Sequence, residues 1–134
     1  MCLEVTVFLP RGEKSKASDK GVSEASGLRV RKYRADDGKE TFHLSQGGGC
    51  SCDLLPPKFS WEKPTWELVP ERLPSLAAAV AKVASQSKAF SFRARWLGSD
   101  RPNPSSKEVG LTALLSIIRA NAIGNGVEYV VGAA

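Results

Sequence analysis

The stretch LRVRKYRADDGKETFHLS, residues 28–45, decides the fold expected for this chain. Two strand-like segments, 28–34 and 39–45, flank the tetrapeptide Ala35-Asp36-Asp37-Gly38. Asp-Gly is among the strongest short hairpin signals, because both central positions of the tightest hairpin turn favour a positive φ. The sequence therefore predicts a β-hairpin, and with it an antiparallel part of a sheet.

Other segments predict the rest of a two-layer structure. Alternation of apolar and polar residues predicts strands over 2–9, 90–97 and 127–131. Apolar residues at helical spacing predict helices over 75–87 and 107–123, the second capped by Ser106. The expected fold class is α+β: a two-layer sandwich in which a largely antiparallel or mixed sheet of about five strands carries two helices on one face.

Length and composition indicate a single globular domain. The 134 residues fit one domain, 1–134, and 42% hydrophobic residues are enough to build a core. Residues 11–27 are mostly small and polar, so we expect a flexible loop there. Residues 56–74 hold several prolines and two tryptophans, which predicts an irregular connection.

The sequence predicts a cytoplasmic protein without a membrane partner. Its longest apolar run, 76–81, is far shorter than the ~20 residues that cross a bilayer. The N-terminus lacks the basic region that opens a secretory signal. Three cysteines are an odd number at low density, which argues against a disulfide scaffold and suits a reducing compartment.

The most unusual stretch is Gly47-Gly48-Gly49-Cys50-Ser51-Cys52-Asp53. It holds two of the three cysteines and closely follows His43, the single histidine. Three consecutive glycines let successive backbone N–H groups point into one concavity. We therefore expect this loop to bind a small-molecule ligand or a protein partner.

Zinc is an alternative ligand for the same region. Cys2, His43, Cys50 and Cys52 together supply three thiols and an imidazole, a set that tetrahedral zinc accepts. The one-residue spacing of Cys-Ser-Cys is shorter than the two to four residues usual in structural zinc sites. No other cofactor is predicted.

Two further interpretations of the cysteines stay open. A disulfide between Cys50 and Cys52 would close a small strained ring and would be labile, which suits thiol redox chemistry. The Cys-x-x-Cys pattern of thioredoxin-like enzymes is absent. Alternatively, both cysteines are small buried residues beside a glycine turn, because free cysteine is among the most buried residue types.

Arginines alternate along two of the predicted strands. Arg29, Arg31 and Tyr33 share one side of the first, and Arg93 and Arg95 share one side of the second. If the two sides align in one sheet, the resulting face suits single-stranded nucleic acid or another polyanion. The pattern lacks the aromatic pair and glycine spacing of an RNA-recognition motif, and alternating arginines also suit the solvated side of an antiparallel sheet.

No catalytic constellation emerges from the sequence. A single histidine gives no specific Ser-His-Asp arrangement, and no pair of carboxylates stands out. The glycines are not followed by the Gly-Lys-Ser/Thr of a phosphate-binding loop. We therefore expect a small binding domain, with nucleic acid as an alternative partner, more readily than an enzyme.

Overall fold

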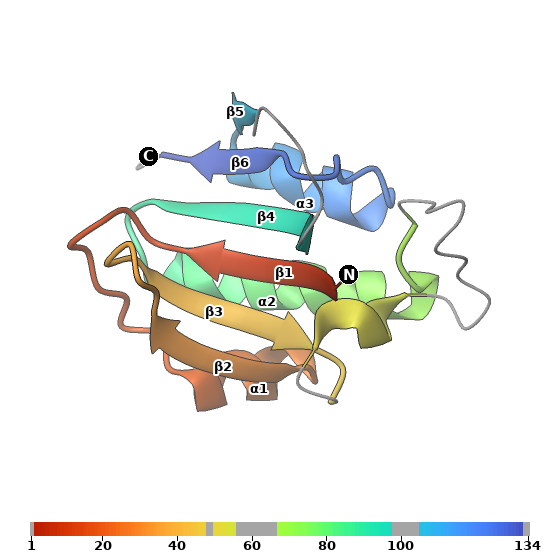
Figure 1. Cartoon of the computed structure of the whole chain (residues 1–134), viewed down its shortest axis with the longest axis horizontal. Helices are drawn as coiled ribbons and strands as arrows, with labels where there is room; N and C mark the ends of the chain where they lie inside the picture. Colours follow the sequence, from red (N-terminus) through yellow and green to blue (C-terminus); the bar gives the residue numbers. More distant parts are fainter. Residues whose placement is uncertain (1, 48–49, 56–66, 98–104, 133–134) are drawn as a thin grey trace.

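The computed structural model describes residues 2–47, 50–55, 67–97 and 105–132, without the side chains of residues 2, 96 and 97. In these ranges six strands form one sheet and three α-helices pack against it (Figure 1). The strands are β1 (Cys2–Phe8), β2 (Arg29–Arg34), β3 (Glu40–Ser45), β4 (Phe90–Leu97), β5 (Ser106–Glu108) and β6 (Glu128–Val131). The α-helices are α1 (Asp19–Ser26), α2 (Leu73–Ser85) and α3 (Leu111–Arg119), and the short 3-10 helices are η1 (Ser51–Leu54) and η2 (Pro70–Arg72).

The sheet is open and mostly antiparallel, in the order β2-β3-β1-β4-β6-β5. Only the β5–β6 pair is parallel. The first four strands follow the connection β1-α1-β2-β3-α2-β4, a split β-α-β arrangement, and β5-α3-β6 extends it beyond β4. The α+β fold class expected from the sequence is therefore confirmed, with a sixth strand and a third helix added.

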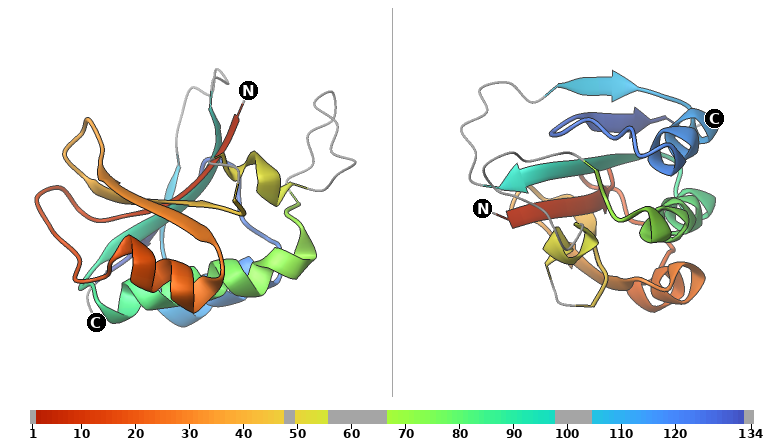
Figure 2. Two further views of the ribbon diagram at one scale, coloured as in Figure 1. Left: turned by 90° about the horizontal axis from the view of Figure 1, so that it is seen from below. Right: turned by 90° about the vertical axis from the view of Figure 1, so that its right-hand side faces the viewer.

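All three helices cover the same face of the sheet, so the structure has two layers (Figure 2). Alternate residues of the central strands point into the layer between sheet and helices, as Leu3, Val5 and Val7 of β1 do. They meet the buried side of α2, which includes Ala77 and Val80. These residues belong to one continuous apolar core.

The predicted hairpin is present, with a different turn. Arg34 pairs with Glu40, and the N–H of Gly38 donates to the carbonyl of Ala35 at 2.9 Å. Of the turn residues, only Gly38 has a positive φ, of 82°. The hairpin therefore closes through a bulge-type turn with one left-handed glycine, not through two left-handed residues.

The loop expected over 11–27 is corrected by the structure, because its second half is helix α1. Ser18 caps this helix by accepting from the N–H of Gly21 at 2.9 Å, and Gly27 ends it with a φ of 75°. Val22 supplies the buried contact. Capping at both ends therefore defines a helix that has very little apolar surface.

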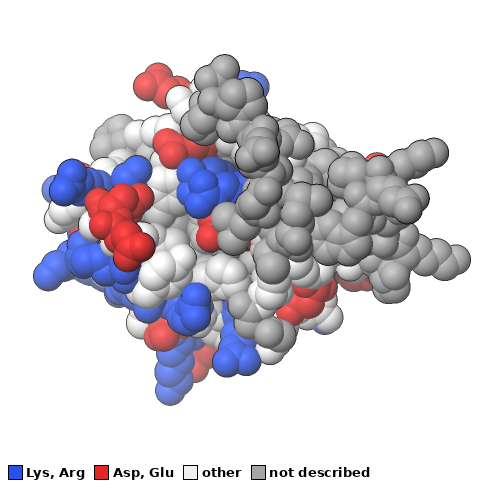
Figure 3. Space-filling model, viewed as in Figure 1, with Lys and Arg blue, Asp and Glu red and all other residues white. Residues whose placement is uncertain are grey.

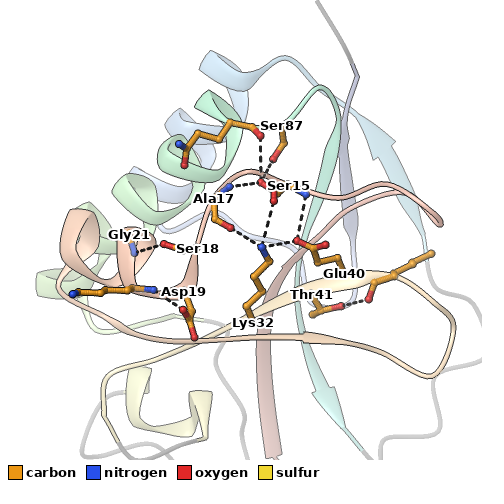
Figure 4. Close-up of polar contacts among 12 residues, drawn as sticks. Ser15, Ala17, Ser18, Asp19, Gly21, Lys32, Glu40, Thr41 and Ser87 are labelled. Carbon is orange, nitrogen blue, oxygen red and sulfur yellow. Dashed lines mark hydrogen bonds and ion pairs between the residues drawn. The ribbon is translucent and has the colours of Figure 1, made fainter.

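Polar contacts hold the first half of this segment against the sheet (Figure 4). The ammonium of Lys32 donates to the carbonyls of Ser15 and Ala17, at 3.3 and 2.7 Å. The hydroxyls of Ser15 and Ser87 lie 2.7 Å apart, which ties the segment to the turn before β4. The chain between β1 and α1 is thus anchored at several points despite its polar composition.

The helix expected over 107–123 is shorter and begins later. Ser106, taken as its cap, lies instead in the edge strand β5, and α3 begins after Gly110. The described end of the predicted 56–74 connection contains η2 and the first residues of α2, while 56–66 lie outside the described residues. None of the helices in the described ranges has the length and apolarity needed to cross a membrane.

Candidate functional site

The face of the sheet opposite the helices, called here the open face, carries a row of polar and charged residues. Directly paired residues on β2, β3, β1, β4 and β6 form this row: Arg31, His43, Thr6, Arg93 and Glu128. Directly paired residues point to the same side of a sheet. Arg31 and Arg93 are therefore three strand spacings apart on one face, about 14–15 Å at 4.7–4.9 Å per spacing.

The other arginines of the sequence prediction lie on the same face. Arg29 and Tyr33 are two residues either side of Arg31 on β2, and Arg95 is two residues beyond Arg93 on β4. The two predicted sides thus align in one sheet, across the strands that separate them. Whether these residues bind a ligand stays a prediction.

All four arginines make contacts within the chain, and those of Arg95, Arg29 and Arg31 are with a carboxylate, a carbonyl and an aromatic ring. Arg95 donates from Nε to Oε1 of Glu4 at 3.0 Å, an ion pair across the β1–β4 ladder. Arg29 donates from Nη1 to the carbonyl of Gly47 at 3.0 Å. The guanidinium of Arg31 lies 5.1 Å from the centroid of the Tyr33 ring, a cation–π contact.

Arg93 is different, because it stacks on an aromatic ring beside a second cation. Its guanidinium lies 5.1 Å from the centroid of Phe8, and Nζ of Lys39 lies 5.2 Å from the same centroid. Among the described residues, neither cation has an ion-pair partner. Nε of Arg93 is buried and has no hydrogen-bond acceptor there. Burial, and then the positive charge of Arg95, lower the pKa of Arg93 from its ordinary value.

These side chains surround a pocket of about 310 Å³ on the open face. Its floor is formed by three nearly buried residues, Thr6, Phe8 and Thr41, which are 2%, 6% and 5% exposed. The walls come from β1, β2, β4 and the hairpin turn: Glu4, Tyr33, Arg34, Ala35, Asp36, Asp37, Lys39, Arg93 and Arg95. Figure 3 shows the open face, where basic and acidic side chains lie close together.

His43 lies between Arg31 and Thr6 in the row, where its surroundings favour the neutral imidazole. Burial, followed by the nearby charge of Arg31, lowers the pKa of His43 below its ordinary value. Its Nε2 lies 3.3 Å from the hydroxyl of Ser51. That hydroxyl donates its one proton to the carbonyl of Leu44 and accepts from the N–H of Val5. The imidazole therefore donates to Ser51, so His43 is not placed as a base for that hydroxyl.

Residues 47–53, called here the glycine–cysteine loop, complete the edge of β1 with their described part. β3 pairs with β1 only from Thr6 onward, which leaves the N–H groups of Leu3 and Val5 without a strand partner on that side. Sγ of Cys52 accepts from Leu3 at 3.1 Å, and Oγ of Ser51 accepts from Val5 at 3.0 Å. Two side chains of η1 thus take the place of a neighbouring strand.

The loop also closes on itself. The carboxylate of Asp53 accepts from the N–H groups of Gln46 and Gly47, at 2.7 and 3.0 Å. Sγ of Cys50 lies 3.5 Å from the N–H of Cys52. Gly48 and Gly49, which the sequence analysis expected to shape a ligand cradle, lie outside the described residues. Ligand binding at this loop and redox use of its thiols stay predictions.

The zinc set of Cys2, His43, Cys50 and Cys52 is likewise a prediction, because the side chain of Cys2 is not described. Among the described side chains, no group of three metal-ligating residues gathers. His43 instead directs Nε2 toward Ser51.

Sequence reasoning missed the residues that turn the arginine face into a pocket. Glu4 and Phe8 alternate along β1 with Leu3, Val5 and Val7, so the period-2 pattern was a signal that could have placed them on the open face. Their closeness to Lys39 and Arg93 depends on the strand order, which the pattern does not supply.

No protein-family model matches this sequence, and neither a curated protein nor a solved structure matches it. The functional argument therefore depends on the chemistry of the open face.

Proposed function

We propose that this chain is a binding module whose open face takes single-stranded nucleic acid. The observation that carries the proposal is the register, which brings Arg31 and Arg93 into one row across the sheet. Such a row offers separated guanidinium groups to a phosphate backbone on a face where no described helix packs. A net charge of +5 favours the approach of a polyanion.

Tyr33 adds a surface for stacking to the same face. It is only partly buried, and Arg31 lies against its ring. Aromatic rings beside arginines bind single strands with little dependence on sequence, since every base has a flat face. Because the chain lacks the aromatic pair of an RNA-recognition motif, we expect sequence-tolerant binding.

The glycine–cysteine loop is the weaker candidate for a nucleic-acid site. Ser51 and Cys52 use their polar atoms on backbone groups of β1. A separate ligand or protein partner at this loop remains a proposal, and replacing Cys50 and Cys52 with serine tests it through partner binding. A cytoplasmic location, which the low cysteine content favours, is part of the same proposal.

Fluorescence anisotropy with labelled single-stranded RNA and DNA of mixed sequence tests the main proposal. Binding is expected to weaken as salt rises, with a logarithmic slope of about −0.7 for each phosphate neutralised. A variant with glutamine at Arg29, Arg31, Arg93 and Arg95 should bind at least about tenfold more weakly and show a shallower slope.

A matched control variant distinguishes binding by the open face from a general effect of the net charge. Glutamine at Lys16, Lys20, Lys88 and Arg119, which are exposed and lie away from the open face, lowers the net charge from +5 to +1 just as the first variant does. This control should keep most of the affinity. Equal losses in both variants, or salt-insensitive binding by the parent protein, would contradict the proposal.

A further inference from the structure

The pocket on the open face concentrates positive charge around one ring. Lys39 and Arg93 both lie just over 5 Å from the centroid of Phe8, which is on β1. Arg93 approaches the ring from the neighbouring strand β4, and Lys39 approaches it from the other side, just before β3. Ion pairs among the described residues join Arg95 to Glu4 and Lys32 to Glu40 only, so neither cation at Phe8 has one. Of the acids that line the pocket, Glu4 is paired with Arg95, while Asp36 and Asp37 lie at the hairpin turn. Lys39 and Arg93 are thus two neighbouring cations without an ion pair, an arrangement that favours a bound anion.

We propose that this pocket binds the terminal phosphate of a single-stranded nucleic acid, an inference that rests on the proposed function. A terminal phosphate monoester carries nearly two negative charges near neutral pH and presents three oxygens. Charge-assisted hydrogen bonds from a guanidinium and an ammonium are the strong kind for such a group. Nε of Arg93, which has no acceptor among the described residues, is a donor that such an oxygen would satisfy after a small side-chain rotation.

The acidic rim explains why the phosphate is terminal and not internal. Asp36 and Asp37 are exposed at the hairpin turn and line the outer side of the pocket. A backbone that continued past the pocket over this turn would bring its next phosphates against two carboxylates. A strand that ends in the pocket avoids this repulsion, and its remaining phosphates run along the row toward Arg31.

The size of the pocket agrees with this geometry. A volume of about 310 Å³ lies at the lower end of small-ligand pockets and suits one nucleotide-sized group. Thr6 and Thr41 form a nearly buried floor, so the group enters from the open face and stops there. Tyr33 in the pocket wall is placed beside the base of that nucleotide.

The test compares oligonucleotides of one sequence with a 5′-phosphate, a 3′-phosphate or hydroxyls at both ends. One of the phosphorylated oligonucleotides should bind about tenfold or more tightly than the hydroxyl-ended one. Inorganic phosphate should compete with that oligonucleotide more effectively than chloride at equal ionic strength near pH 8, where phosphate carries two negative charges. Lys39→Gln should bring the ratio of affinities close to one, and Lys20→Gln on α1 should leave it unchanged.

Arg93→Gln gives a second test of the same ratio, with circular dichroism and thermal unfolding to confirm that the variant folds. Asp36→Asn with Asp37→Asn should tighten binding of the hydroxyl-ended oligonucleotide most, because the rim would no longer repel an internal backbone. Equal affinities for all three oligonucleotides would overturn the terminal-phosphate site and leave the proposed function standing. Absence of binding by any of them at low salt would overturn both.

Discussion

Nζ of Lys32 lies 2.9 Å from Oε1 of Glu40 on the helix-facing side of the β2–β3 hairpin. Glu40 is 7% exposed, and its carboxylate also accepts from the N–H of Ser15. A single ion pair thus joins the hairpin to the chain that precedes α1, where sequence composition had suggested a loose loop.

Lys32→Met should lower the free energy of unfolding by about 1–3 kcal/mol, since it leaves the Glu40 carboxylate and two carbonyls without their cation. Chemical denaturation measures this loss. A double variant with Glu40→Met as well should recover part of it, because both charges are then gone. Lys20→Met, at an exposed site on α1, is the control, and a loss of similar size there would contradict the role given to Lys32.

Ser51→Ala should destabilise the fold by about 1–3 kcal/mol. The hydroxyl of Ser51 is fully buried, and its removal leaves the N–H of Val5 without an acceptor at the edge of β1. Hydrogen exchange at Val5 should accelerate in step with the loss of stability. Ser116→Ala, at an exposed position of α3, should change the stability by less than about 0.5 kcal/mol.

The stability should decline as the pH falls from 7.5 toward 5, in part because of His43. Its pKa is lowered in the folded state, mainly by burial, so the unfolded chain binds a proton more readily. The contribution is fully present above the unfolded pKa of about 6.5 and is lost as the pH falls toward the lower folded value. His43→Gln should remove this part of the pH dependence.

NMR titration measures the same pKa directly, because His43 is the single histidine of the chain. Arg31→Gln should raise the pKa of His43, since the charge of Arg31 is the second cause of its lowering. An unchanged titration in that variant would show that the two side chains do not interact across the β2–β3 pair.

Gly27→Ala should cost about 1–2 kcal/mol, because Gly27 ends α1 with a φ of 75° that other residues adopt only with strain. Gly47→Ala is the matched change, at a glycine without a positive φ and with open space around the added Cβ. It should alter stability by less than about 0.5 kcal/mol. Thermal unfolding of the two variants side by side tests the difference, and equal effects would count against it.

The sequence predicted the sheet more successfully than the polar elements around it. Strands 28–34, 39–45 and 90–97 follow from alternation, because burial of one face imposes period two. Helix α1 was missed because Val22 is its main apolar contact, and the caps at Ser18 and Gly27 were the only signals left. β5 has no buried residue and exists through its pairing with β6, so no local pattern marks it.

The candidate site was predictable in part: the side of each arginine on its strand, but not the pocket. Alternation placed Arg29, Arg31 and Tyr33 on one side of their strand, and Arg93 and Arg95 on one side of another. The pocket was not predictable, because Phe8 meets Lys39 and Arg93 only through the order β3-β1-β4.

The charge of β2 has a consequence for solubility. β2 is an edge strand, so one side of its backbone is a template on which another strand can add. Four of its six residues are basic: Arg29, Arg31, Lys32 and Arg34. Two copies of this edge repel one another, which protects the chain against edge-to-edge aggregation. Glutamine at Arg29 and Arg31 should therefore have two effects: weaker binding of nucleic acid and a stronger tendency to aggregate. Both effects come from the loss of the same positive charges.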